Sequence, residues 1–345
     1  MHKDIAIEEA LAMTKANFVD VRSPGEFALD TIPGAVNVPL LNDEERHRVG
    51  LVFAERGPQE ARQVGLSLVA PKLPQMVSRL RELKGEGPLV IFCWRGGDRS
   101  YAVAHLLDIM HIPCFRITGG YKAYRRYVNR HLREESLPHQ FVVLQGLTGA
   151  GKTEILRELA RRGYPVLDLE ELANHRGSVF GSVGLGEQPS QKKFESLILH
   201  RIRSYGESKL LIVEGESKKI GKLFVPEAVY EGILHGRKVW VTDTMGNRVK
   251  RLIREYVENT QGDMAEVEQA LQRLTPRLGK DKVQQMLGHL ARGELEQVSE
   301  MLITDYYDVL YKKSVTAPAD CDLVIEAGDL EAAVKQLEEY INHFM

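Results

Sequence analysis

One short stretch of the chain, residues 93–100, combines a cysteine with glycines and arginines in a pattern suited to a sulfur nucleophile. Cys93 directly follows the apolar run Leu89–Phe92 and precedes a helix-like run, and Arg95 and Arg99 lie between them. Loop amides, a helix N-terminus and cationic side chains all stabilise an anion on sulfur. We therefore expect Cys93 to take up and pass on a sulfur or selenium atom, assisted by Arg95 and Arg99. The alternative, an inert cysteine buried in a turn, leaves the two arginines without a role.

A second anion-binding motif, Gly-Leu-Thr-Gly-Ala-Gly-Lys-Thr, occupies residues 146–153 between an apolar run and a helix-like run. In this P-loop pattern the loop amides and the lysine hold phosphates. The residues expected to bind phosphate are Gly146, Gly149, Gly151, Lys152 and Thr153. Glu214 ends the apolar run 210–213, where such folds hold Mg²⁺, so we add it to this site and expect that Mg²⁺ can bind there. The alternative for Glu214 is an acid that only ends a strand.

Four more polar residues are expected to form the opposite wall of a crevice around the P-loop. Asp168 and Glu170 follow a short apolar run, and His175 and Arg176 lie in a segment rich in glycine and serine. A solvated loop is the alternative for all four. The P-loop identifies phosphates but not the group attached to them, and we find no clear Asn-Lys-x-Asp guanine motif. A nucleotide and the diphosphate of another donor are therefore both candidate ligands.

Two basic clusters are candidates for binding RNA. Segment 121–133 has five Lys/Arg, no acid and three tyrosines, and segment 237–254 has six Lys/Arg against one acid. Such residues neutralise backbone phosphates and stack on unpaired bases. The proposed RNA contacts are Lys122, Arg125, Arg126, Arg248, Arg251 and Arg254. The alternatives are solvated helix faces or, for the arginines from 248 onward, a lid over the ligand of the P-loop.

Composition restricts the class of protein. No window approaches the roughly 18 uninterrupted apolar residues that a membrane span needs, and the first residues resemble no targeting signal, so we expect a cytoplasmic protein without membrane contact. Three unrelated cysteines argue against disulfides and zinc clusters, and we name no metal ligands besides the Mg²⁺ candidates. A net charge of −2 means that any RNA binding must come from local patches.

Apolar runs separated by helical stretches predict an α/β protein of two domains. We expect a first domain at 1–133, with strands at 18–21, 35–38, 89–92 and 114–117, and a short linker at 134–139. The second domain, 140–345, should be a doubly wound parallel sheet with strands at 141–145, 165–168, 210–213, 239–242 and 322–326. A mostly helical excursion at about 245–313 is expected to form a lid or added subdomain.

The first domain resembles the rhodanese sulfurtransferase family. The resemblance rests on residues 20–27 (Asp-Val-Arg-Ser-Pro-Gly-Glu-Phe), on 32–39, on the Cys93 loop and on 118–121 (Thr-Gly-Gly-Tyr), and covers about residues 5–130. It implies that Cys93 is the nucleophile that carries the chalcogen.

The order of the two domains, with residues 43–65, 174–178, 213–217 and 305–307, resembles the tRNA 2-selenouridine synthase family. This resemblance implies that the tRNA partner carries 2-thiouridine at the wobble position. The sulfur would be alkylated by geranyl diphosphate, and selenium from selenophosphate would then replace the S-geranyl group. Cys93 would carry selenium as S-selanylcysteine, and we infer that the P-loop holds the prenyl diphosphate. The alternatives are a thiosulfate-type sulfurtransferase with an accessory NTPase domain and a regulatory RNA-binding NTPase. The sequence leaves the oligomeric state open.

Overall fold

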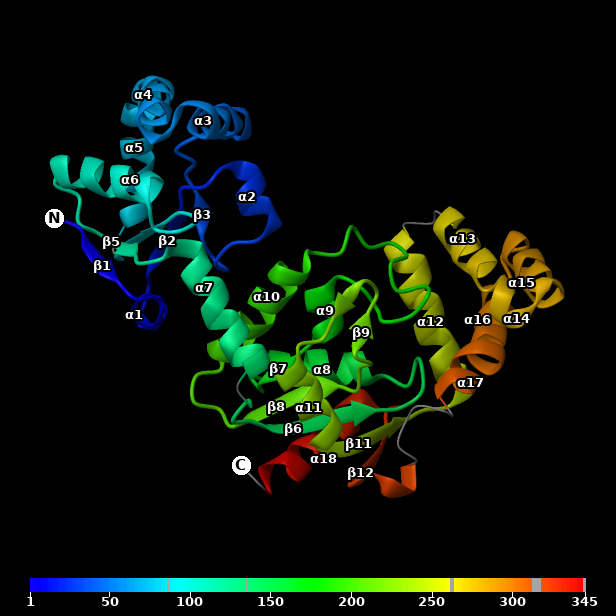
Figure 1. Cartoon of the computed structure of the whole chain (residues 1–345). Helices are drawn as coiled ribbons and strands as arrows, with labels where there is room; N and C mark the ends of the chain where they lie inside the picture. Colours follow the sequence, from blue (N-terminus) through cyan, green and yellow to red (C-terminus); the bar gives the residue numbers. More distant parts are fainter. Residues whose placement is uncertain (86, 135, 261–263, 312–317, 344–345) are drawn as a thin grey trace. The chain divides into compact units, whose positions relative to one another are not determined.

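A computed structural model describes residues 1–85, 87–134, 136–260, 264–311 and 318–343 and divides the chain into two compact units (Figure 1). The first unit comprises Met1–Glu134 together with Glu195–Leu197, and the second comprises Glu135–Phe194 and Ile198–Met345. The predicted linker 134–139 contains residue 135, and the predicted excursion 245–313 contains 261–263 and 312–313. Those positions lie outside the described residues.

The first unit contains a five-stranded parallel sheet in the order β1-β5-β4-β2-β3. Its strands are β1 (Lys3–Ile5), β2 (Asn17–Asp20), β3 (Val36–Asn37), β4 (Leu89–Phe92) and β5 (Cys114–Ile117). All four strands predicted in this region are confirmed, with ends that differ by one residue at most. Strand β1 was not predicted because its three residues include only one buried side chain and form no apolar run.

The described residues of this unit also form the helices α1 (Ile7–Ala12), α2 (Pro24–Leu29), α3 (Asp43–Arg56), α4 (Pro58–Val69), α5 (Leu73–Lys84), α6 (Asp98–Ile109) and α7 (Gly120–Asn129). Short turns at Ala70–Lys72 (3₁₀) and Arg130–Glu134 (π-helical) extend two of them. Helix α2 begins with a capping box, in which the side chains of Ser23 and Glu26 each accept a hydrogen bond from the other residue's backbone amide. Pro24 follows at the first helical position, where a backbone N–H would have no partner within the helix, so the missing N–H of proline costs nothing. All four residues of β4 are buried, as expected of a central parallel strand, and the strand therefore holds Cys93 firmly at its end.

The second unit contains a separate five-stranded parallel sheet in the order β12-β11-β6-β8-β7. Its strands are β6 (Gln140–Gln145), β7 (Val166–Leu167), β8 (Leu210–Glu214), β11 (Arg237–Thr242) and β12 (Leu323–Glu326). The five predicted strands are confirmed. A two-stranded antiparallel hairpin, β9 (Lys219–Ile220) with β10 (Leu223–Phe224), was missed because two-residue strands leave no periodic signal.

Helices α8 (Lys152–Arg161), α9 (Leu169–Ala173), α10 (Gln191–Ser204), α11 (Glu227–His235) and α18 (Leu330–Asn342) accompany this sheet. Apolar residues of α8 and α18, such as Leu156 and Leu337, share one core with Val142 and Ile212 of the sheet. On β6 the alternate residue Phe141 instead lies against α11, where a Cβ on Gly232 would be 2.4 Å from its ring. Helices thus cover both faces, which confirms the doubly wound class.

The excursion between β11 and β12 is helical, as predicted (Figure 1). It contains α12 (Met245–Thr260), α13 (Ala265–Arg273), α14 (Thr275–Leu278), α15 (Lys280–Ala291), α16 (Leu295–Leu302), a π-helical turn (Ile303–Tyr307) and α17 (Asp308–Tyr311). These helices have a core of their own, which also includes Phe180 and Val183. Within the described part of the chain, no helix combines the length and the apolar character needed to span a membrane.

Candidate functional site

The first unit places Cys93 at the turn between β4 and α6. Its side chain is buried, and its Sγ lies 3.2 Å from the Oγ of Ser100 in the first turn of α6. Ser100 Oγ in turn donates to the carbonyl of Gly97 at 3.2 Å. The cysteine therefore lies beside a hydroxyl and the N-terminal turn of a helix.

Two glycines allow the loop at residues 118–121 to pack closely against the cysteine loop. Gly120 has a left-handed backbone (φ +55°), and a Cβ there would lie 2.2 Å from the carbonyl oxygen of Cys93. A Cβ on Gly96 (φ +66°) would lie 2.8 Å from the amide nitrogen of Gly119. Through this approach the amide of Tyr121 donates to the Cys93 carbonyl at 2.8 Å. The Thr-Gly-Gly-Tyr segment thus fixes the backbone that carries the sulfur.

The two arginines of the cysteine loop differ in their surroundings. Arg95 is exposed, whereas the Arg99 guanidinium donates to both carboxylate oxygens of Glu26, at 2.6 and 3.3 Å. Burial opposes the charge on Arg99, but the hydrogen bond and charge of Glu26 raise the pKa of Arg99 overall. Arg99 therefore links the cysteine loop to helix α2, and Arg95 is the loop cation that faces solvent.

The basic residues of α7 fall into two groups. Lys122 and Arg126 are exposed and, being four residues apart, share one helix face. Arg125 is buried, donates to Ser196 Oγ at 2.9 Å and forms an ion pair with Glu195. The prediction that Arg125 contacts RNA does not agree with this position, because a buried, ion-paired guanidinium is not available to a phosphate backbone.

In the second unit the P-loop lies between β6 and α8, with Lys152 as the first residue of the helix. Lys152 Nζ donates to the carbonyl of Gly146 at 2.9 Å and lies 3.4 Å from Glu214 Oε1 at the end of β8. Thr153 Oγ1 donates to Glu214 Oε2 at 3.3 Å. The three predicted residues therefore come together, with the lysine held by groups that an incoming phosphate can replace.

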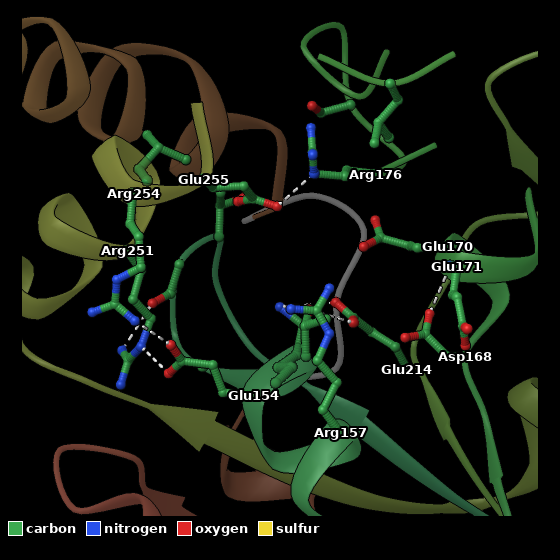
Figure 2. A pocket seen from close by; sticks show the side chains of 18 of the residues that line it. Glu154, Arg157, Asp168, Glu170, Glu171, Arg176, Glu214, Arg251, Arg254 and Glu255 are labelled. Atoms are coloured by element: carbon green, nitrogen blue, oxygen red, sulfur yellow. Dashed lines mark hydrogen bonds and ion pairs between the residues drawn. The ribbon is translucent and has the colours of Figure 1, made fainter. Parts of the chain in front are cut away.

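The loop opens into a cavity of about 470 Å³ that charged side chains line from several elements (Figure 2). The basic side chains in the lining are Lys152, Arg157, Arg176, Arg251 and Arg254. The acidic ones are Glu154, Asp168, Glu170, Glu171, Glu214 and Glu255. The cations can hold a polyphosphate, and the clustered carboxylates can hold a metal ion that accompanies it.

Several of these carboxyl groups hold protons more tightly than usual. Burial, reinforced by the charge of Glu214, raises the pKa of Glu170 well above its ordinary range and that of nearby Glu216 to about 8. Burial is also the main cause that raises the pKa of Asp168 and of Glu255. Carboxylates packed this closely repel one another, so a bound cation would relieve the repulsion.

The predicted wall of the crevice is only partly correct. Asp168 and Arg176 line the cavity, and Asp168 also caps α9 by accepting from the amide of Glu171 at 2.8 Å. His175 is buried and is not among the lining residues; its Nδ1 accepts from the amide of Gly177 at 3.1 Å. Burial and the charge of Arg176 lower its pKa, which favours the neutral ring. His175 therefore stabilises the turn at residues 175–177 and does not line the cavity.

Of the three arginines of α12, Arg248 and Arg251 contact the backbone of the P-loop, so the row does not form an exposed basic face. Arg248 is buried; its Nε donates to the carbonyl of Thr148 at 2.9 Å and its guanidinium pairs with Asp308. Arg251 donates to the carbonyl of Gly149 at 3.1 Å and pairs with Glu154 and Asp243, each at 2.6 Å.

Only Arg254 of this row is largely exposed, and it pairs with Glu154 at 3.0 Å. For Arg248 the predicted RNA contact is inconsistent with its burial, and it does not line the cavity. Arg251 does line the cavity, a position compatible with the lid alternative.

Arg157 and Glu255 are among the residues of this cavity that were not predicted. Arg157 lies one helical turn after Thr153 on α8, so helical spacing from the P-loop could have identified it. Glu255 lies on α12 and pairs with Arg176 at 3.0 Å (Figure 2). No sequence signal points to Glu255, because only the folding of α12 over the P-loop brings it there.

Comparison with known proteins gives matches along nearly the whole chain. A family model described as the tRNA 2-selenouridine synthase AAA domain matches residues 139–343, and a rhodanese-like domain model matches residues 6–127. The tRNA 2-selenouridine synthase of Nitrosomonas europaea is 31% identical, covering 90% of this chain and 93% of the relative. That of Cupriavidus pinatubonensis is 33% identical, covering 98% and 99%.

Among solved structures, the N-terminal domain of a putative ATP/GTP binding protein from Clostridium difficile 630 is 39% identical. The match covers 36% of this chain and 98% of that one, with a TM-score of 0.36.

Proposed function

Because the chain belongs to the tRNA 2-selenouridine synthase family, we propose that it replaces the sulfur of wobble 2-thiouridine in tRNA with selenium, in two steps carried out by its two sites. The observation that carries the proposal is that one chain combines a cysteine at a strand-to-helix turn with a P-loop whose lysine faces a highly charged cavity. The first arrangement suits transfer of a chalcogen, and the second suits release of a polyphosphate.

In the first step the P-loop would hold geranyl diphosphate. The sulfur of 2-thiouridine forms a bond to C1 of the geranyl group, the C1–O bond breaks and diphosphate leaves, and N3 of the base gives up its proton to water. Lys152, Arg157 and Arg251 line the cavity where the charge of the leaving group grows. Cations already in position there lower the barrier because they need no rearrangement as the charge develops.

The cavity also offers a limited apolar surface. Leu185, Leu252 and Tyr307 are among its lining residues, between the charged groups. A prenyl chain can be shielded from water by such side chains, which supports a prenyl diphosphate as the ligand.

Mg²⁺ is compatible with the residues present. The Thr153 hydroxyl and the Glu214 carboxylate lie within hydrogen-bond distance of each other, and such oxygen ligands suit a hard cation. Thr153 and Glu214 would hold Mg²⁺ together with diphosphate oxygens. When bound, the ion would neutralise part of the charge on the leaving diphosphate.

In the second step, the Cys93 thiolate would form a bond to C2 of the base as the C2–S bond breaks and geranylthiol leaves. Selenophosphate would then attack C2 through selenium as the C2–Sγ bond breaks, and water would cleave the Se–P bond to release phosphate. Ser100 and the helix N-terminus lie beside the Cys93 sulfur. The exposed Arg95 provides a positive charge toward the phosphate-containing donor. For the tRNA itself, Lys122 and Arg126 are the exposed cations of α7 that would contact the backbone.

The first step is tested by adding geranyl diphosphate to purified protein and 2-thiouridine tRNA and measuring nucleosides by mass spectrometry. We expect Lys152→Ala to reduce geranylation at least about 100-fold, since the variant loses a cation that stabilises the leaving group. The matched control is Lys335→Ala on the surface of α18, which should behave as wild type. Wild-type geranylation by Lys152→Ala would show that the P-loop does not hold the prenyl donor.

A further inference from the structure

Apart from the two sites, the first unit brings two histidines and a carboxylate together beside β1 and α6. His2 directly precedes β1, and the pairing of Lys3 with Phe115 in β5 fixes where that strand begins. His105 and Asp108 are three residues apart on α6 and therefore share a helix face. The sequence gives no hint of this cluster because about a hundred positions separate His2 from the other two residues.

The three side chains converge on a small volume. Asp108 Oδ2 lies 2.7 Å from His2 Nδ1 and 3.8 Å from His105 Nδ1. Each residue offers a ligand atom within 4.8 Å of those of the other two. His105 Nε2 is buried and has no hydrogen-bond partner among the described residues. The exposed amino group of Met1 is 3.7 Å from the other oxygen of Asp108, which leaves Oδ2 to the imidazoles.

We propose that His2, His105 and Asp108 bind a divalent transition-metal ion, with Zn²⁺ as the best match. Tetrahedral Zn²⁺ holds imidazole nitrogens and carboxylate oxygens at about 2.0–2.2 Å, so neighbouring ligand atoms are about 3.3 Å apart. The two separations from Asp108 Oδ2, 2.7 and 3.8 Å, bracket that value, and all three ligand atoms lie within 4.8 Å of one another, so side-chain rotations can bring them to one ion. Imidazole ligands favour Zn²⁺ over Mg²⁺ or Ca²⁺, and a water molecule would complete the coordination.

The site would act as a clamp between the first strand and α6. Helix α6 begins at Asp98, directly after the cysteine loop, and its Ser100 contacts Cys93. His105 and Asp108 lie in the second half of the same helix. An ion bound to them and to His2 would anchor the helix that forms one side of the cysteine site, without taking part in the reaction.

The test uses the full chain with Cys93→Ala, so that the reactive thiol cannot bind metal, and with millimolar Mg²⁺ to occupy hard-cation sites in the second unit. After chelation and removal of bound metal, Zn²⁺ is titrated by calorimetry and Co²⁺ by visible absorption. We expect one equivalent of Zn²⁺ to bind and Co²⁺ to give the intense absorption bands of a tetrahedral site.

Adding His105→Ala or Asp108→Asn should weaken Zn²⁺ binding at least about 10-fold and remove the Co²⁺ bands. His47→Ala, an exposed histidine on α3, is the matched control and should bind as the parent protein does. His105 is itself partly exposed, so its loss should leave the fold intact, which circular dichroism verifies. Equal Zn²⁺ affinity in all variants, or no Co²⁺ bands in the parent protein, would overturn the proposal.

Discussion

Of the three cysteines, Cys93 alone lies at the turn between a strand and a helix N-terminus. Cys114 is buried within β5, and burial raises the pKa of its thiol to about 12, so it stays protonated. Cys321 is partly exposed just before β12, and burial together with Asp322 raises its pKa. These differences support the proposal that Cys93, and not Cys114 or Cys321, is the nucleophile.

We predict that Cys93→Ala abolishes 2-selenouridine formation while S-geranylated tRNA persists, because the variant loses the nucleophile but keeps the P-loop. Mass spectrometry of tRNA nucleosides from cells that carry only this variant measures both products. Cys321→Ala serves as the control and should leave 2-selenouridine at wild-type levels. Undiminished 2-selenouridine with Cys93→Ala would rule out the assigned role.

At the same scale, the raised pKa of Glu216 predicts a dependence of stability on pH. The unfolded chain releases this proton near pH 4.5 and the folded chain near pH 8, so the second unit loses stability as pH rises between these values. Glu216→Gln removes that loss. We expect the free energy of unfolding of the variant, relative to that of wild type, to increase by about 1–2 kcal/mol when the pH is raised from about 5 to about 8. This is less than the full linkage value because water reaches the partly exposed carboxylate.

The two tryptophans allow this measurement on one unit at a time, since Trp94 lies in the first unit and Trp240 in the second. Urea unfolding followed by Trp240 fluorescence in a Trp94→Phe background reports the second unit. If the difference between Glu216→Gln and its parent is the same at pH 5 and pH 8, Glu216 does not titrate in this range.

At the scale of elements, the close packing of the Gly120 loop on the cysteine loop sets a steric limit. Gly120→Ala adds a left-handed strain and a methyl group 2.2 Å from the Cys93 carbonyl oxygen. We expect it to destabilise the first unit by about 3 kcal/mol, against about 1 kcal/mol for Gly34→Ala, where φ is +82° but no atom lies within 4 Å. Trp94 fluorescence in a Trp240→Phe background measures both, and equal losses would show that the clash is relieved.

Helix α12 contributes to the P-loop through its arginines, and this role can be separated from RNA binding. Arg251→Gln removes donors to Gly149 and Ala327 and the ion pairs with Glu154 and Asp243. We expect the KM for geranyl diphosphate to rise about 10-fold or more, because the loop is less well positioned, while tRNA affinity is unchanged.

The control for this prediction is a double variant with Lys122→Gln and Arg126→Gln on the exposed face of α7. It should weaken tRNA binding and reduce the slope of log binding constant against log salt concentration by about 0.7–0.9 per lost contact. A reduced slope for Arg251→Gln with unchanged donor kinetics would instead identify Arg251 as an RNA contact.

At the scale of the whole molecule, the proposal assigns one step to each unit, so the steps should be separable. Lys152→Ala should convert S-geranylated tRNA supplied from outside into 2-selenouridine at the wild-type rate, since the cysteine site is unchanged. Mass spectrometry of the product, with Cys93→Ala as the inactive control, measures this. Failure of Lys152→Ala on the preformed intermediate would mean that the P-loop also serves the second step.

Much of the fold and both candidate loops could be predicted from the sequence alone. Apolar runs and glycine-rich turns are local features, so the central strands of both sheets, the Cys93 loop and the P-loop could all be predicted. Contacts between distant segments leave no local pattern. Spacing alone could not show that Arg125 and Arg248 are buried and ion-paired, or that His175 lies outside the cavity.

The tertiary structure alone decided which charges face each other. It placed Glu255 and Arg251 of α12 against the P-loop, and His2 beside His105 and Asp108. A charged residue on a helix reads the same in sequence whether it points to solvent, to a buried acid or to a ligand. The partner that the fold brings to it, and the water that the fold removes, determine its role.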